Sequence, residues 1–173
     1  MTQAVSMCLS IILAPPTQKD LDFANTDPEV FLNTVTLNLR SVFLASQAAV
    51  RYMRKTGGGS IINISSVGGL VPDISQVSYG TSKAAINYLT KLIAVHEAKN
   101  NIRCNAVLPG MTATEAVEKH LSEEFRSLFL RHIPLGRMGL PEEIAAAVVL
   151  GTYNNVNSLV FVKTFVQTVK DMT

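Results

Sequence analysis

The stretch SIINISSVGGLVPDISQVSYGTSK, residues 60–83, combines a short apolar run with the beginning of a helical pattern. The run SIINIS, residues 60–65, is rich in β-branched side chains, which is typical of a strand buried on both faces of a parallel sheet. The helical pattern extends from about residue 78 to residue 99, where Asn100 and Asn101 would end it. A strand followed by a helix after a short connection is the repeating unit of parallel α/β sheets.

The segments on either side of this stretch repeat the alternation of strand and helix. Residues 29–55 follow the helix-entry pair Asp27-Pro28 and stop at a run of glycines, so they predict a long, largely buried helix. The sequence predicts strands near residues 7–14 and at residues 102–110, and helices at residues 122–131 and 141–150. VNSLVFVKTFV, in the final segment 152–173, fits a strand or an amphipathic helix equally well.

Composition bounds the classes of function that are open to the chain. With 173 residues and 47% hydrophobic content, the chain can bury a core of one domain. A net charge of +2, from 15 basic and 13 acidic residues, gives no reason to expect a nucleic-acid partner. No segment is long and apolar enough to predict a membrane span, so no membrane partner is expected.

Cysteine and histidine usage argues against a metal site and favours a cytoplasmic protein. Cys8 and Cys104 are far apart and fit no metal-ligand spacing, which suggests reduced, buried thiols. The three histidines, His96, His120 and His132, form no ligand spacing with one another or with the cysteines. The prediction is therefore that the chain holds no metal.

Tyr79, Lys83 and Ser66 are the residues that could carry chemistry. On a helix, Tyr79 and Lys83 lie one turn apart on the same face, close enough for the ammonium to favour the phenolate and lower the pKa of the phenol. Ser66 follows the predicted strand at its carboxyl end, where open α/β sheets collect their ligands. The three groups together suit proton transfer to or from a substrate oxygen.

A Tyr-x-x-x-Lys pair alone is more often structural than catalytic, but the surrounding pattern is specific. NISSVGG at the end of the strand, YGTSKAA at the start of the helix and NAVLPGMTAT after the next strand together resemble the short-chain dehydrogenase/reductase family. The resemblance implies hydride exchange between a nicotinamide cofactor and a secondary alcohol or ketone. The absence of a Gly-x-Ser-x-Gly motif around either serine counts against the alternative of a serine hydrolase.

The resemblance also implies a role for each matching residue. Tyr79 would exchange a proton with the substrate oxygen, and Ser66 would orient and polarise the carbonyl. Lys83 would lower the pKa of the tyrosine and hydrogen-bond the nicotinamide ribose. Asn38, in the preceding long helix, would hold a water in a proton relay, although a helix asparagine can also simply bond a neighbouring carbonyl.

The cofactor implied by the resemblance is NAD or NADP. Besides Tyr79 and Lys83, the residues expected to contact it follow the strand at 102–110: they are Pro109, Gly110, Thr112 and Thr114. The Pro-Gly turn would pass beneath the nicotinamide, and the two threonines would meet its carboxamide. The choice between NAD and NADP stays open, because the residue that makes it follows the family's second strand.

A narrower resemblance concerns the substrate. Residues 64–116 and the segment HIPLGRMGLPEEIA, residues 132–145, look like the bacterial 7α-hydroxysteroid dehydrogenases, which act on bile acids. The match covers roughly residues 19–150. It implies a small-molecule substrate, a steroid or another secondary alcohol, and a homodimer or homotetramer that is built through the helices around Asn38 and Tyr79.

The sequence departs from the family pattern in three places. The glycine-rich turn T-G-x-x-x-G-x-G does not occur, ILAPPTQK stands where Asn-Asn-Ala-Gly is usual, and residues 152–173 lack the usual ending. We therefore expect a single domain, residues 1–173, with a partial doubly wound, Rossmann-like parallel sheet that lacks the first βαβ units and an atypical tail at 152–173. These departures count against tight cofactor binding. They leave two hypotheses open: an oxidoreductase, or a non-catalytic fragment or interaction subunit that retains the dimer helices.

Overall fold

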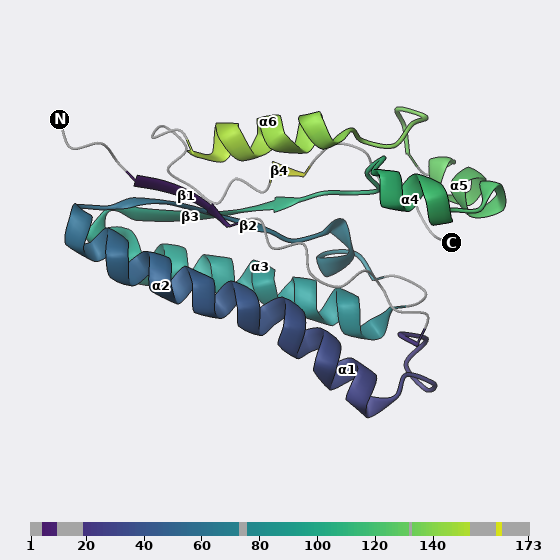
Figure 1. Ribbon diagram of the computed structural model, residues 1–173, viewed down its shortest axis with the longest axis horizontal. Coiled ribbons are helices and arrows are strands. Elements are labelled where there is room, and N and C mark those ends of the chain that lie inside the picture. Colours follow the sequence, from purple (N-terminus) through teal and green to yellow (C-terminus); the bar gives the residue numbers. More distant parts are fainter. Residues whose placement is uncertain (1–4, 10–18, 73–75, 132, 153–161, 164–173) are drawn as a thin grey trace.

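A parallel sheet of four strands forms the middle layer of the structure (Figure 1). The computed structural model describes residues 5–9, 19–72, 76–131, 133–152 and 162–163. The strands are β1 (Val5–Leu9), β2 (Gly59–Ile64), β3 (Ile102–Leu108) and β4 (Val162–Lys163), and they pair in that order. Since every pairing is parallel, the carboxyl ends of the strands lie at one edge of the sheet. The predicted parallel α/β class is confirmed.

The predicted strands agree with the structure to within a few residues where the structure describes them. β2 and β3 are joined in register from Gly59 opposite Ile102 to Ile64 opposite Val107. β1 begins earlier than the predicted strand at 7–14, and residues 10–14 lie outside the described residues. In the final segment, 152–173, only Thr152 and the two residues of β4 are described, so the alternatives for this tail are otherwise untested.

The long helix that precedes β2 consists of three consecutive parts. They are α1 (Pro28–Val35), the π-helical turn η1 (Thr36–Arg40) and α2 (Ser41–Thr56). The predicted ends are confirmed: the Asp27 carboxylate accepts a hydrogen bond from the Glu29 amide at 2.7 Å, and Gly57 ends the helix with φ of 92°. The prediction of one uniform α-helix is wrong in the middle, where η1 adds a residue to the turn.

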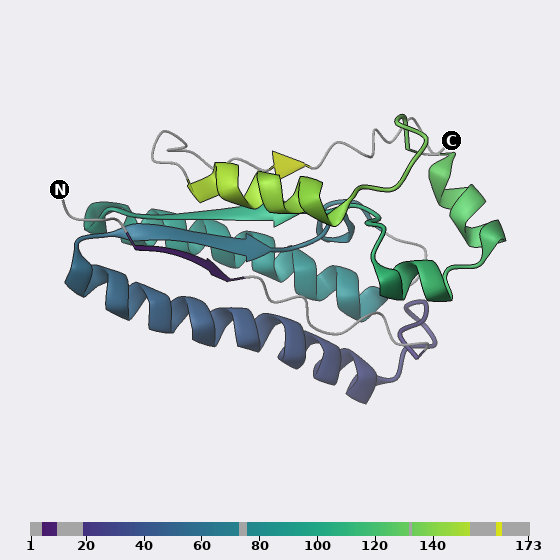
Figure 2. The ribbon, with the colours of Figure 1, turned by 45° about the horizontal axis from the view of Figure 1, so that its top comes forward.

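Helices cover both faces of the sheet (Figure 2). α1, α2 and α3 (Val77–Glu97) lie on one face, and α6 (Pro141–Thr152) lies on the other. One apolar cluster packs between α2 and the sheet; it comprises Ala49, Met53, Ile61, Ile102 and Cys104. A second packs against α6; it comprises Ile62, Ile64, Val107 and Ala147. β2 supplies isoleucine side chains to both clusters, and burying each of them contributes about 1.5–3 kcal/mol.

The segments beyond the carboxyl ends of β2 and β3 surround the edge where the candidate residues lie. The short turn η2 (Val67–Gly69) follows β2 directly and packs against α3. After β3 come α4 (Glu115–His120), which the sequence analysis missed, and α5 (Glu123–Leu130), which it predicted. None of the described helices is both long enough and apolar enough to cross a membrane.

Candidate active site

Ser66, Tyr79 and Lys83 meet at the carboxyl end of β2. Tyr79 lies in the first turn of α3, and the Ser66 hydroxyl, just beyond β2, lies beside its side chain. The Nζ atom of Lys83 lies 5.5 Å from the centroid of the Tyr79 ring. The structure therefore brings together three of the four residues that the sequence analysis predicts to be catalytic.

The turn η2 is fixed to α3 at the level of Lys83. The Ser65 hydroxyl donates a hydrogen bond to the backbone oxygen of Lys83 at 3.0 Å, and the Gly68 amide donates to Ser66 Oγ at 3.2 Å. A Cβ atom at Gly69 would lie 2.7 Å from the backbone carbon of Lys83, so only glycine allows this close approach. These contacts fix the position of Ser66 relative to α3, the helix that carries Tyr79.

Lys83 is a buried cation. Its side chain is among the largest that are fully buried, with the residue 2% exposed, and its Nζ donates to the backbone oxygen of Ile64 at 3.2 Å. Burial disfavours the charged form and lowers the pKa of Lys83 to about 8. At pH 7 the charged form therefore still predominates.

The phenol of Tyr79 is shifted in the opposite direction from the one predicted from sequence. Its burial raises the pKa above the ordinary tyrosine value, and the neighbouring Ser66 hydroxyl only partly offsets this rise. The expectation that Lys83 would lower the pKa of Tyr79 fails here because desolvation of the phenolate is the larger effect. At neutral pH the phenol is therefore protonated, which makes it a proton donor.

Asn38 lies in the π-helical turn η1 and is linked to α3 through the side chain of Ser82. It is 2% exposed, and its Nδ2 donates to Ser82 Oγ at 2.9 Å. The Ser82 hydroxyl in turn donates to the backbone oxygen of Tyr79 at 2.7 Å. Asn38 thus contacts the catalytic helix, and its buried Oδ1 has no hydrogen-bond partner among the described residues.

The residues predicted to meet the nicotinamide lie in the segment after β3. The Pro109 backbone oxygen accepts from the Val67 amide at 3.0 Å, which joins this segment to the turn beside Ser66. The Thr112 hydroxyl donates to the Gly110 oxygen at 3.2 Å, and Thr114 caps α4 by accepting from the Val117 amide. Both threonine side chains thus make local hydrogen bonds, and both remain partly accessible.

Sequence reasoning missed three polar side chains that hold the site. Ser65 and Ser82 bond backbone atoms of Lys83 and Tyr79, as described above, and Asp20 bonds the start of α3. Ser65 and Ser82 stand next to Ser66 and Lys83 in the sequence, so their proximity was a usable signal. Asp20 gave none, because it lies far from α3 in sequence and within a polar loop.

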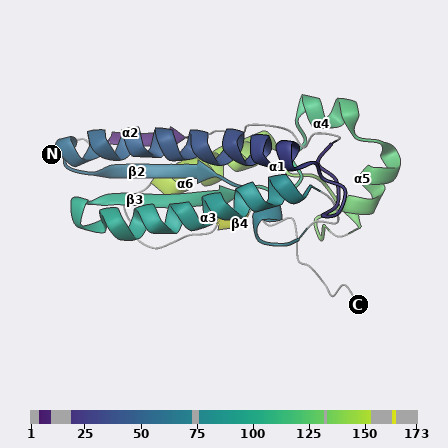
Figure 3. The same ribbon diagram turned by 90° about the horizontal axis from the view of Figure 1, so that it is seen from below.

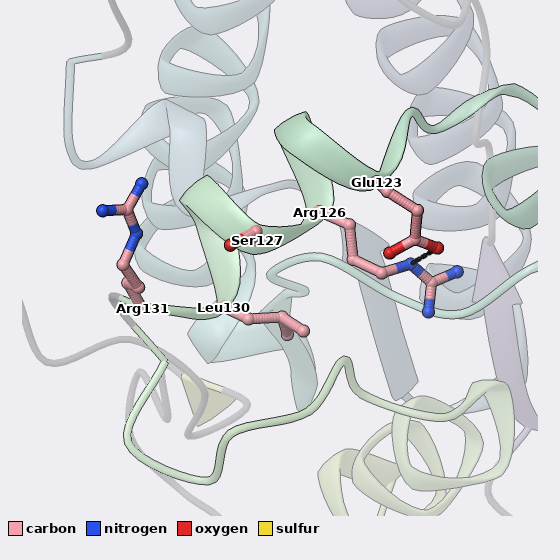
Figure 4. A pocket seen from close by; sticks show the side chains of 5 residues that line it. All are labelled: Glu123, Arg126, Ser127, Leu130 and Arg131. Atoms are coloured by element: carbon pink, nitrogen blue, oxygen red, sulfur yellow. Dashed lines mark ion pairs between the residues drawn. The ribbon is translucent and has the colours of Figure 1, made fainter.

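Two cavities in the described part of the structure lie away from this site. One of about 370 Å³ lies along α5 and is lined by Glu123, Arg126, Ser127, Leu130 and Arg131 (Figure 4). In that cavity the Arg126 guanidinium lies 3.7 Å from the Glu123 carboxylate, while Arg131 points away from both. A second, of about 540 Å³, lies between the loop from Lys19 and the start of α1. We place the candidate site by its chemistry, since neither cavity contains an arrangement for proton transfer.

The residues at the site offer partners that a nicotinamide nucleotide could use. The Lys83 ammonium has three donors, of which the Ile64 oxygen takes one, so ribose hydroxyls fit the remaining capacity. Tyr79 presents its phenol beside that cation. These observations fit the ribose and nicotinamide portion of the cofactor.

Comparisons with known proteins agree with this geometry. Residues 7–150 match the family model described as enoyl-(acyl carrier protein) reductase. A 7α-hydroxysteroid dehydrogenase from Clostridium sardiniense is 50% identical over 129 residues, which cover 75% of this chain and 49% of the relative. A protein of the same name from Paraclostridium sordellii is 49% identical over 131 residues, covering 76% and 49%.

A solved structure shows the same architecture. It is a short-chain type dehydrogenase/reductase from Mycobacterium ulcerans, which superposes with a TM-score of 0.77 at 27% identity. The superposition covers 82% of this chain and 52% of that one. The chain spans about half the length of the curated relatives it matches.

Proposed function

The chain belongs to the short-chain dehydrogenase/reductase family, and from its site geometry we propose that it is an oxidoreductase acting on a secondary alcohol or ketone with NAD or NADP. The observation that carries the proposal is the position of the Ser66 hydroxyl beside the Tyr79 side chain, with the buried Lys83 cation beside the ring. This arrangement combines a proton donor, a polar partner for a substrate oxygen and a positive charge.

Tyr79 is the proposed proton donor and acceptor. In the direction of reduction, the phenol gives its proton to the carbonyl oxygen as the hydride reaches the carbonyl carbon, and the product is a secondary alcohol. In the reverse direction, the phenolate takes the hydroxyl proton. When bound, the nicotinamide cofactor supplies or accepts the hydride. The raised pKa of Tyr79 favours the protonated form at neutral pH, which is the form that acts as proton donor in the reductive direction.

Ser66 and Lys83 support the transfer in different ways. The Ser66 hydroxyl, which lies beside the Tyr79 side chain, would bond the substrate oxygen and hold it near the phenol. Lys83 would stabilise the phenolate after the proton has left, and would donate to the ribose. Asn38, whose buried Oδ1 has no hydrogen-bond partner among the described residues, would hold a water molecule. Pro109, Gly110, Thr112 and Thr114 are the residues proposed to border the nicotinamide.

For the substrate, we propose a hydroxysteroid, with the 7α-hydroxyl of a bile acid as the reacting group. The support is the identity of 50% and 49% with two proteins named 7α-hydroxysteroid dehydrogenase. We further propose that residues 1–173 act as a single domain, whose catalytic edge is the one described above.

The experiment that tests the function is an assay for reduced nicotinamide. The purified chain is incubated with a 7α-hydroxylated bile acid and either NAD or NADP, and the ultraviolet absorbance of the reduced cofactor is followed. Simple secondary alcohols serve as comparison substrates, and Tyr79→Phe is the matched control because it removes only the phenolic oxygen. Turnover that Tyr79→Phe abolishes is expected. Turnover that survives in Tyr79→Phe would exclude the assigned role of the phenol.

The rival hypothesis, a non-catalytic subunit, is separated from this one by cofactor binding. Calorimetric titration with NADH and with NADPH should give saturable binding that weakens in Lys83→Met. Absence of saturable binding together with absence of turnover would favour the non-catalytic reading.

A further inference from the structure

The amino-terminal end of α3 is held by a residue from a distant part of the chain. Asp20 lies in the loop before α1, is 4% exposed, and approaches the first turn of α3. Its Oδ1 accepts from the Ser78 amide at 2.9 Å and from the Ser78 hydroxyl at 2.7 Å. Its Oδ2 accepts from the Tyr79 amide at 2.9 Å. The buried Asp20 carboxylate thus accepts three hydrogen bonds, and one of them comes from the amide of the proposed catalytic tyrosine.

The helix provides no such cap from its own sequence. Gln76, at the N-cap position, has φ of 69° and makes no capping hydrogen bond with its side chain in the described structure, and the first turn contains no acidic residue. Helix N-termini leave amide donors unpaired and favour a nearby negative charge. Asp20 therefore supplies from outside what a local N-cap residue normally provides.

The neighbour of Asp20 pairs the remaining amides of the turn. The Leu21 backbone oxygen accepts from the Gln76 amide at 3.1 Å and from the Val77 amide at 3.5 Å. Asp20 and Leu21 together therefore accept hydrogen bonds from four consecutive backbone amides, those of residues 76–79. The first turn of α3 cannot slide or rotate without breaking several of these bonds at once.

The loop that carries Asp20 has its own internal support. The Leu21 amide donates to Thr26 Oγ1 at 3.0 Å, and the Asp22 carboxylate accepts from the amides of Ala24 and Asn25. Asp20 is therefore presented from a loop that is already folded on itself.

We propose that Asp20 is a positioning residue that fixes the first turn of α3 and thereby holds the Tyr79 phenol beside Ser66. For the reaction itself, this inference rests on the proposed function. Asp20 touches backbone amides and the Ser78 hydroxyl, so it acts through the helix. Asp20 holds the backbone of Tyr79 through the Tyr79 amide, while Ser66 lies beside its side chain.

The test compares Asp20→Ala with Asp22→Ala. Asp22 is the matched control, because it is an acidic residue of the same loop whose carboxylate bonds Ala24 and Asn25 rather than α3. Each protein is also prepared with Tyr79→Phe, so that the ultraviolet titration of Tyr79 is obtained as a difference from the other three of the four tyrosines. In the described structure the charged groups that face Tyr79 are Lys83 and Asp20 itself.

In Asp20→Ala we expect the first turn of α3 to loosen and the phenol to meet water. The pKa of Tyr79 should then fall toward that of free tyrosine, and the amides of Ser78 and Tyr79 should exchange hydrogen faster. Asp22→Ala should change neither. In a turnover assay, Asp20→Ala should lower kcat by roughly tenfold to a hundredfold with little change in KM, since displacing the reacting group affects the chemical step.

Two further variants keep the proposal falsifiable if Asp20→Ala does not fold. Asp20→Asn retains one acceptor oxygen, and Ser78→Ala removes one donor while leaving the carboxylate. Both variants should lower the pKa of Tyr79, as Asp20→Ala does, but by a smaller amount. A folded Asp20 variant whose Tyr79 titrates as in the unaltered chain would overturn the proposal. The titration needs no turnover, so a failure of the proposed function would show separately, as a chain that never reduces the cofactor.

Discussion

Burial shifts the pKa values of Tyr79 and Lys83, the two titratable residues at the site. It raises the pKa of the Tyr79 phenol and lowers the pKa of the Lys83 ammonium to about 8, so each is pushed toward its neutral form. A pair that is shifted in this way can exchange a proton with substrate near neutral pH without large changes in net charge. The neighbouring Ser66 hydroxyl opposes the rise in the pKa of Tyr79.

The buried lysine should leave a signature in the pH dependence of stability. With a folded pKa of about 8, against the ordinary 10.5 of an unfolded chain, the unfolded state binds more protons between these values. The contribution of Lys83 to the free energy of unfolding is therefore unfavourable below pH 8, and rises through this window by an amount on the order of 2 kcal/mol. Lys83→Met should flatten the rise between pH 8 and 10, as measured by urea unfolding.

The control for this prediction is Lys99→Met, because Lys99 is an exposed lysine whereas Lys83 is buried. The measurement stops at pH 10 because the pKa of Tyr79 is raised in the folded state. Above this pH the tyrosine ionises more readily in the unfolded chain, which lowers the free energy of unfolding. A rise of equal size in Lys83→Met and in the unaltered chain would contradict the assignment.

At this scale the sequence revealed the spacing of the site but not its electrostatics. The four-residue separation of Tyr79 and Lys83, and the strand before Ser66, were enough to predict that the three side chains meet. The direction of the Tyr79 shift could not be predicted, because it depends on how much water reaches the phenol. Asp20 was unpredictable for another reason: its partners are set by the path of a loop, which no periodic pattern encodes.

Among the elements, η2 is the one whose packing most directly controls the site. It follows β2 and lies so close to α3 that a Cβ atom on Gly69 would stand 2.7 Å from the Lys83 backbone carbon and 2.8 Å from the Ala84 amide nitrogen. Since the opposing atoms are backbone, neither can move aside without shifting the helix. The contact therefore couples the position of Ser66 to that of Tyr79 and Lys83.

Gly69→Ala should accordingly disturb both stability and activity. We expect a loss of about 1–3 kcal/mol in the free energy of unfolding, which is typical of an added methyl group in a tightly packed contact. Any turnover should fall as well, because η2 must move away from α3. Chemical denaturation and the cofactor assay measure the two effects.

Gly57→Ala is the matched control for this change. Gly57 has φ of 92°, so alanine there costs about 1 kcal/mol of backbone strain, but the added Cβ meets no atom within 4 Å. Gly57 caps α2, at the opposite end of the sheet from the site, and turnover should stay as it is. Equal losses of turnover in the two variants would mean that the contact at Gly69 does not position the site.

The helices illustrate which parts of an element a sequence predicts. Asp27-Pro28 and the glycine run fixed the ends of the long helix, because caps and terminators have specific chemistry. The π-helical turn at Asn38 left no sequence signal, since one extra residue in a turn is accommodated by tertiary contacts rather than by propensity. The helix α4 has only six residues, too few to show a clear period.

On the scale of the whole molecule, the layer formed by α2 and α3 (Figure 3) carries several exposed apolar side chains. Tyr88, Leu92 and Val95 form an exposed stripe along α3, with exposed fractions of 64%, 36% and 71%. On α2, Leu44 and Tyr52 are exposed by 49% and 57%. Their helices lie side by side over one face of the sheet, so the apolar side chains face away from the core.

This apolar face supports the proposal that the protein forms a homodimer or homotetramer through these helices. The double variant Tyr88→Lys/Val95→Lys puts two charges on the α3 stripe and should shift the chain toward monomer, because a charge buried in an interface without a partner is costly. Sedimentation velocity over a range of concentrations measures the shift.

Val149→Lys on α6 is the control, since Val149 is also an exposed apolar residue, at 54%, but on the opposite face of the sheet. The α3 variant should remain folded by circular dichroism, since neither residue belongs to the buried core. An unaltered chain that sediments as a monomer at all concentrations, or an oligomer that the α3 variant leaves intact, would place the subunit contact elsewhere or remove it.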